Sequence, residues 1–172
     1  LAIKGMKERE VKKSKQMLED NGLKIALSAI KYYLLRVETV KDMTFNPEES
    51  LSFEGETGPY LQYSYARANS ILKKSKKKPN LKIPTKIENE EIELIKKIAD
   101  FPNAIDNSAK QLNPSIMAHY AHHLAQTFNE FYHNTKVIGE DEESFRLKIV
   151  DSFKTTLKNA LYLLGIEVME EM

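Results

Sequence analysis

Two tyrosines and an arginine recur at helical spacing in the middle of the chain, and their side chains are suited to holding unpaired nucleobases. Tyrosine rings and a guanidinium plane can both stack on bases that lie outside a duplex. At 100° per residue, one face of the predicted helix carries Tyr60, Tyr63, Ser64, Arg67 and Ile71. The same tyrosines could instead be half-buried residues of a helical bundle with their hydroxyl groups in water. The pattern alone leaves both interpretations open.

Basic residues follow on the same segment. Residues 57–87 contain no Asp or Glu, but they hold Arg67 and seven lysines, of which Lys73 and Lys74 come first. Such an uneven charge distribution favours a surface that faces a polyanion, and we expect Lys73 and Lys74 to contact phosphates. Alternatively, these lysines only occupy the solvent-exposed faces of helices and bind no partner.

The segment just before the tyrosine helix bears two glycines. Backbone N–H groups at the start of a helix favour anions or the hydrogen-bonding edges of bases. We therefore expect the loop to belong to the same binding surface, through Glu54, Gly55, Thr57 and Gly58.

All four histidines fall in one predicted helix that begins at Pro114. His119 and His123 stand four residues apart and could bind a metal ion together with Glu130, but the His-Glu-x-x-His pattern is missing. Neutral histidines on a solvated face are the ordinary explanation, and a metal-dependent enzyme is the alternative. The chain also lacks cysteine, a Gly-x-Ser-x-Gly elbow and a Walker-type loop. We expect no catalytic residue, metal or cofactor site in this chain.

The elements that must position these residues are helices. Apolar residues recur at steps of three and four, and no segment alternates for long with a period of two. We expect an all-α bundle of about five to six helices. One helix follows a cap at Asp20 or Asn21 and carries Leu23, Leu27, Ile30 and Leu34, and residues 42–58 form a loop. The other helices are expected over residues 59–76, 90–99, 101–112, 114–134 and 142–164.

Length and composition set further bounds. The chain has 172 residues, 41% of them hydrophobic, which suits one ordinary domain with a real core. No apolar run approaches the roughly 20 residues of a membrane span. Because the chain starts with Leu1 and lacks a signal-like segment, we interpret it as a piece of a larger protein.

Three blocks of the sequence resemble a known family. The first runs from Leu51 to Leu72 and contains Gly-Pro-Tyr-Leu-Gln-Tyr at residues 58–63. The second covers residues 124–134, and the third ends in Leu-Leu-Gly-Ile at residues 163–166 and in Met172. These blocks resemble the DALR anticodon-binding domain of arginyl-tRNA synthetases, over nearly the whole chain from about Asn21.

The resemblance implies a function for the chain and for the protein around it. The bundle, residues 21–172, would bind the anticodon stem-loop of arginine tRNA, and residues 1–20 would be a tether. The tether would lead from a catalytic domain in cis that joins arginine to its tRNA using ATP with Mg²⁺. This fragment would itself carry no catalytic site. The parent would be a cytoplasmic arginine-tRNA ligase, not attached to a membrane and monomeric.

The resemblance also implies roles for single residues. The loop from Glu54 to Gly58 would face the anticodon, and Tyr60 and Tyr63 would meet its nucleotides. Tyr132 would lie near the middle anticodon base, and Met172 would complete that pocket. The phosphate role of Lys73 and Lys74 rests on charge alone.

Two other readings remain at this point. The chain could be the anticodon-binding bundle of another tRNA synthetase, or a non-catalytic bundle that docks a protein through the Tyr60, Tyr63 and Arg67 stripe. The tail after Gly165 would fray by default. If Met172 is used, we expect Ile166 and Val168 to hold the tail against the bundle.

Overall fold

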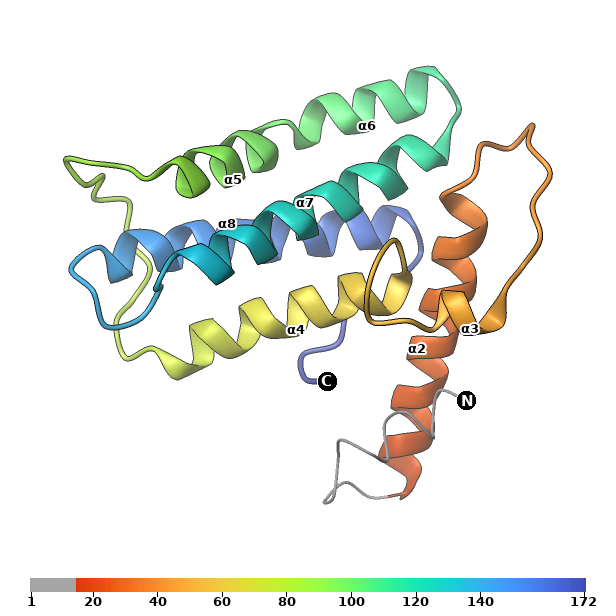
Figure 1. Ribbon diagram of the computed structural model, residues 1–172, viewed down its shortest axis with the longest axis horizontal. Helices are drawn as coiled ribbons and strands as arrows, with labels where there is room; N and C mark the ends of the chain where they lie inside the picture. The colour runs from red at the N-terminus through yellow and green to blue at the C-terminus, as the bar shows by residue number, and fades with distance from the viewer. Residues whose placement is uncertain (1–14) are drawn as a thin grey trace.

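The computed structural model describes residues 15–172, which form an all-α bundle without a strand in that range. The predicted fold class is therefore confirmed. Three long helices, α4, α7 and α8, lie side by side, and α5 and α6 run almost end to end along α7 (Figure 1). The first helix, α2, stands across the ends of the others. The bounds are α2 Lys15–Leu35, α3 Pro47–Ser50, α4 Gly58–Lys74, α5 Asn89–Ala99, α6 Phe101–Lys110, α7 Pro114–Asn134 and α8 Glu143–Leu163.

Local sequence signals set the ends of the helices that matter for the site. The Thr57 hydroxyl accepts a hydrogen bond from the Tyr60 N–H at 3.2 Å, and Pro59 stands in the first turn of α4. At the start of α7, Asn113 Oδ1 accepts from the Ser115 N–H at 3.1 Å. Gly165 ends α8 with φ +66, a left-handed conformation that glycine adopts without strain.

The core lies between α4, α7 and α8. Phe128 of α7 and Phe153 of α8 stack with ring centroids 3.9 Å apart, and both are fully buried. Leu61 and Tyr65 of α4 are buried in the same core, Tyr65 with its hydroxyl 3.0 Å from Glu170. Burial and that hydrogen bond raise the pKa of Tyr65 to about 12. The α4–α7–α8 core is thus the rigid base on which the surface residues of α4 and α7 are held.

The first helix differs from its prediction in both its start and its buried face. It begins at Lys15, so Asp20 and Asn21 lie inside α2 and do not cap it. The predicted apolar stripe is exposed, and the opposite face packs against the bundle through Ile25, Ala29 and Tyr32. Apolar residues occupy both faces of α2, so the periodicity identifies a helix without saying which face is covered. The exposed stripe comprises Leu23, Leu27, Ile30 and Leu34.

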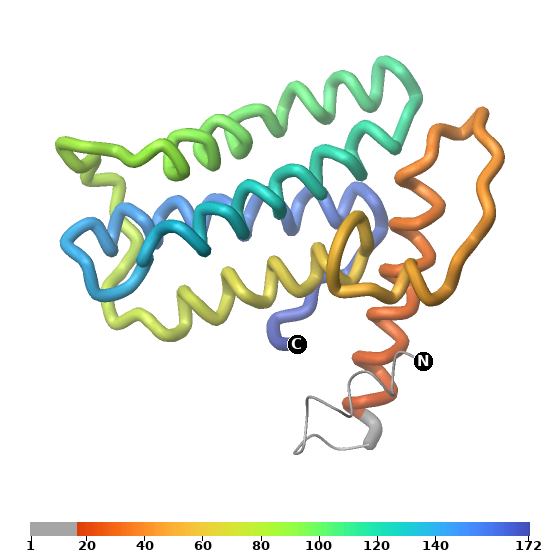
Figure 2. The backbone as a smooth tube through the Cα atoms, in the orientation of Figure 1, coloured from red at the N-terminus to blue at the C-terminus, as the bar shows by residue number. Residues whose placement is uncertain are grey.

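The predicted loop over residues 42–58 holds one short helix, α3, and leads back to the start of α4 beside α2 (Figure 2). The boundary drawn between a tether (1–20) and a bundle (21–172) falls inside α2. Residues 1–14 of that tether lie outside the described residues. No described helix combines the length and the apolar character that crossing a bilayer demands.

The C-terminal tail returns along α4 and is held there by side chains of that helix. Gln62 donates to the carbonyl of Glu167 at 2.7 Å, and Asn69 donates to the carbonyl of Glu170 at 2.9 Å. Ile166 and Met169 are buried. Val168 is partly buried and packs against the core, so the expected apolar contacts of Ile166 and Val168 are confirmed. Two buried amides add a polar clamp that the sequence did not indicate.

Candidate nucleic-acid interface

One groove brings together five of the predicted site residues. It encloses about 760 Å³ between α4, the end of α7 and the C-terminal tail. Its lining includes Tyr63, Arg67, Lys74, Tyr132 and Met172. Side chains from three segments that are distant in the sequence thus meet at one site, because the tail is tied down along α4.

Arg67 is the centre of this groove. Its guanidinium carbon lies 4.7 Å from the centroid of the Tyr63 ring and 5.3 Å from that of Tyr132. These distances suit cation–π contacts. The Tyr132 side chain stacks on Phe128, and the residue is still 42% exposed. The groove therefore offers aromatic surface beside a positive charge, the combination that binds unpaired bases and their phosphates.

Sequence reasoning missed Lys136, which lines the groove, and Asn129, which does not line it but is hydrogen-bonded to Arg67. Asn129 accepts a hydrogen bond from Arg67 at 2.6 Å and donates to the Tyr60 hydroxyl at 2.8 Å. Lys136 lines the groove just after α7. Asn129 precedes Tyr132 by three residues on one helix, so helical spacing could have placed both on one face.

The face of α4 that carries the two tyrosines is only partly exposed. Ser64 and Ile71 are buried, and Tyr60 and Tyr63 are half-buried. Tyr60 lies outside the groove, where its ring meets His122 at a centroid distance of 5.6 Å. Of the two interpretations that the pattern left open, the half-buried one describes Tyr60 and Tyr63, because α7 and α8 cover part of this side of α4. Tyr63 keeps its place in the groove.

The charges around the groove are partly compensated. Lys73 forms a 3.1 Å ion pair with Glu171 of the tail, and Lys77 lies 3.4 Å from Glu143 at the start of α8. Residues 57–87 contain no Asp or Glu, but carboxylates from other segments lie beside these lysines in the folded chain. Lys74 forms no ion pair with a carboxylate of residues 15–172. Arg67 and Lys74 are therefore the cations that the groove presents most directly.

The glycine-bearing loop divides into an exposed and a buried half. Glu54 and Gly55 are exposed. The neighbouring Phe53 ring packs edge-on against the Tyr63 ring, with the two ring centroids 6.4 Å apart. Thr57 and Gly58 are buried and fix the start of α4, so their expected contact with a ligand stays a prediction that this structure does not support directly. A Cβ atom at Gly58 would lie 2.2 Å from the carbonyl oxygen of Ser28, which leaves room for glycine alone.

The histidine face of α7 also differs from the expected solvated row. His122 is packed beside Tyr60, and burial lowers its pKa even though Glu56 lies 3.9 Å away. His119 lies 3.8 Å from the same carboxylate. Within residues 15–172, no three histidine or carboxylate side chains are grouped so that they could hold a metal ion.

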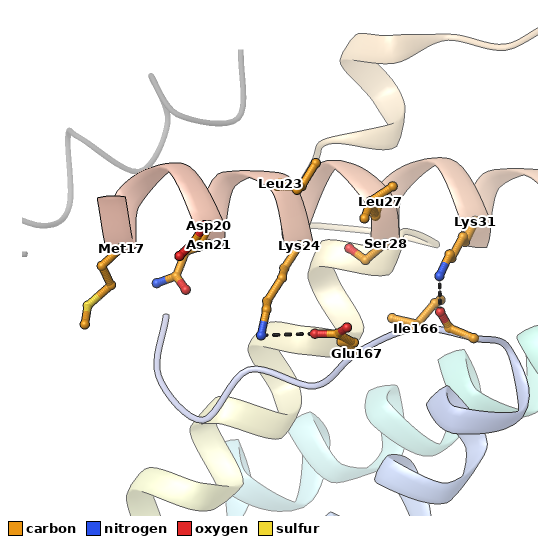
Figure 3. Close-up of a pocket in the computed structure, with 11 residues that line it drawn as sticks. Met17, Asp20, Asn21, Leu23, Lys24, Leu27, Ser28, Lys31, Ile166 and Glu167 are labelled. Atoms are coloured by element: carbon orange, nitrogen blue, oxygen red, sulfur yellow. Dashed lines mark hydrogen bonds and ion pairs between the residues drawn. The ribbon is translucent and has the colours of Figure 1, made fainter. Parts of the chain in front are cut away.

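A second cavity, of about 540 Å³, lies between α2 and residues 165–167 (Figure 3). Lys24 and Glu167 form a 3.0 Å ion pair across it, and Lys31 donates to the carbonyl of Gly165. None of the predicted site residues lines it. The groove between α4, α7 and the tail is therefore the site that fits the sequence predictions.

The fold and the groove together define a class: a helical-bundle domain whose aromatic and basic side chains suit single-stranded nucleic acid. The family described as the DALR anticodon binding domain matches residues 61–172. The chain belongs to this family.

Two relatives with similar sequences are both arginine–tRNA ligases. The arginine–tRNA ligase of Flavobacterium psychrophilum is 42% identical over 151 residues, which are 86% of this chain and 25% of that protein. The arginine–tRNA ligase of Borreliella burgdorferi is 43% identical over 170 residues, 92% of this chain and 28% of that protein. This chain thus spans about a quarter of the length of these relatives.

Solved structures give the same result. The arginyl-tRNA synthetase of Thermus thermophilus matches 99% of this chain and 30% of its own with a TM-score of 0.88 and 32% identity. The enzyme from Plasmodium falciparum matches 90% of this chain and 28% of its own with a TM-score of 0.81 and 29% identity. The resemblance seen in the sequence is confirmed at the level of the family and its fold.

Proposed function

We propose that this chain binds the anticodon stem-loop of arginine tRNA as the recognition module of an arginine-tRNA ligase. The observation that carries the proposal is the groove in which Tyr63, Arg67 and Tyr132 meet beside Lys74 and Met172. The family match and the names of the similar proteins support the choice of arginine tRNA over other tRNAs.

The genetic code sets what the groove must read. All arginine codons have G in the middle, so their anticodons have C there. A splayed-out C could stack on Tyr63 or Tyr132, and backbone groups of the tail or of the loop at Gly55 could read its pairing edge. Stacking is worth about 1–3 kcal/mol per base, which corresponds to roughly 5- to 150-fold in affinity.

The remaining properties of the parent protein belong to this proposal as well. A catalytic domain in cis would join arginine to the tRNA using ATP with Mg²⁺, and that site would lie outside this chain. We place the enzyme in the cytoplasm as a monomer. The relatives support a larger parent, since this chain spans only 25–28% of their length.

An RNA hairpin with the anticodon stem and loop of an arginine tRNA tests the proposal directly. We expect Tyr63→Ala to weaken binding of this hairpin roughly 5- to 150-fold, because a stacking platform is lost. Fluorescence anisotropy of the labelled hairpin would measure the affinity.

Tyr162→Ala is the matched control, since Tyr162 is 80% exposed on α8 and does not line the groove. It should leave the affinity unchanged. Equal affinities for Tyr63→Ala and the unsubstituted chain would remove the stacking role, and equal binding of hairpins with any middle base would reject anticodon reading.

A further inference from the structure

Three side chains of α4 converge on one amide of α7. Asn129 Oδ1 accepts a hydrogen bond from Arg67 Nη1 at 2.6 Å. Its Nδ2 donates to the Tyr60 hydroxyl at 2.8 Å and to the Ser64 hydroxyl at 3.0 Å. One side chain thus uses its acceptor and both of its donor hydrogens on residues of the neighbouring helix.

This bonding pattern fixes the orientation of the amide. The guanidinium group of Arg67 can only donate, so the oxygen of Asn129 must face it, and the nitrogen must face the two hydroxyls. Ser64 is buried and its hydroxyl donates to the Tyr60 carbonyl at 3.0 Å, which anchors that end of the network inside the bundle. Asn129 is therefore a fixed point between the two helices.

The consequence for Arg67 is a defined position. A second nitrogen of Arg67, Nη2, donates to the Tyr63 hydroxyl at 3.0 Å, and the guanidinium carbon lies 4.7 Å from the Tyr63 ring centroid and 5.3 Å from that of Tyr132. Both groups to which it donates are neutral, so these hydrogen bonds hold the side chain without compensating its charge. A long side chain that is already ordered loses little freedom when a ligand binds.

We propose that Asn129 is a positioning residue for anticodon reading: it acts through Arg67 and Tyr60 and need not touch the RNA itself. This inference rests on the proposed function and adds to it a residue on which selectivity for the middle base depends. Loss of the amide would let Arg67 leave the two tyrosine rings, so that the wall of the groove is no longer preformed.

The test uses the 172-residue chain and two RNA hairpins that differ only in having C or U as the middle anticodon base. Asn129→Ala should weaken binding of the C hairpin roughly 2- to 13-fold, the factor expected when one long side chain must be ordered on binding. Arg67 has further N–H donors, which suit the N3 acceptor of C and not the N3–H of U. Binding of the U hairpin should therefore change less, so the ratio of the two affinities falls. Gln126→Ala, at an exposed position on the same helix, is the control and should leave both affinities unchanged.

A double-mutant cycle separates positioning from a general effect on the fold. If Asn129 acts through Arg67, then Asn129→Ala should cost much less in a chain that already carries Arg67→Ala. Independent, multiplicative losses would overturn the proposal, as would an equal loss for both hairpins.

A second variant guards against loss of folding. Asn129→Asp keeps an oxygen facing Arg67, so the C-to-U ratio should be retained while the added negative charge weakens both hairpins alike. A ratio that collapses in Asn129→Asp as it does in Asn129→Ala would contradict the role of the oxygen. If the unsubstituted chain binds both hairpins equally, anticodon reading fails, but the cycle with Arg67→Ala still decides whether Asn129 positions that side chain.

Discussion

His122 shows how far the surroundings of one side chain can depart from its sequence context. It lies on the face of α7 that also carries His119 and Gln126. Its ring is nevertheless packed beside Tyr60, and its Nδ1 is buried without a hydrogen-bond partner among residues 15–172. Burial disfavours the charged imidazolium, and this lowers the pKa of His122 below its ordinary value of 6.5. Helical periodicity cannot foresee this, because the loop and helix that cover the ring come from residues 56–60.

The lowered pKa predicts the pH dependence of stability. In the unfolded chain His122 takes up a proton near pH 6.5, whereas in the folded chain it does so only at lower pH. The unfolded state therefore binds more protons, and the fold should lose stability as pH falls below about 6.5. Replacement by glutamine removes this contribution, so the difference between urea midpoints at pH 7 and pH 5 should shrink in His122→Gln. A residue that does not titrate gives the control: Gln126→Ala, at an exposed position on the same helix, should show the same pH difference as the unsubstituted chain.

At the scale of helices, the sequence predicts where a helix lies and where most helices end better than it predicts which face of a helix is buried. Thr57, Asn113 and Gly165 stand at ends that the structure confirms, because caps and left-handed glycines act through local geometry. The face of α2 could not be predicted in the same way. Leu23 and Leu27 on one side are no less apolar than Ile25 and Ala29 on the other, and only the packing of α2 against the rest of the molecule decides between the two faces.

The crossing of α2 and α4 depends on one small residue. Because a Cβ atom at Gly58 would meet the backbone of Ser28, Gly58→Ala should push the two helices apart. We expect a loss of about 1–3 kcal/mol in the free energy of unfolding, the usual cost of overpacking. Urea unfolding would measure it.

Gly55 provides a matched comparison, because backbone conformation and not space limits substitution there. Nothing lies within 4 Å of a Cβ atom built there, but φ is +77, a conformation that asparagine tolerates better than alanine. Gly55→Asn should therefore cost less than Gly55→Ala, whereas Gly58→Asn should cost more than Gly58→Ala. The reverse order at residue 58 would show that space does not limit this crossing.

For the whole molecule, the resemblance to a family implies three of the groove residues, Tyr63, Tyr132 and Met172, whereas Arg67 and Lys74 follow from helical spacing and from charge. These five residues meet in one groove, Tyr60 and the loop at Gly55 lie outside it, and the contact of all of them with RNA remains a prediction. The resemblance does not predict which charged side chains form ion pairs across the molecule. Glu171 reaches Lys73 only because the tail returns along α4, and no local pattern indicates that path.

These ion pairs make two neighbouring lysines unequal, and salt dependence can show it. Each phosphate contact on a single strand changes the slope of log affinity against log salt by about 0.7. Lys74→Gln should flatten the slope for the anticodon hairpin by about that amount. Lys73→Gln should flatten it less, because Glu171 already compensates part of its charge and the RNA must first displace that carboxylate. The two variants lose the same charge at adjacent positions, so net charge cannot explain a difference between them. Equal slopes for both would mean that the ion pair opens freely and that all the lysines near the groove act as one diffuse charge.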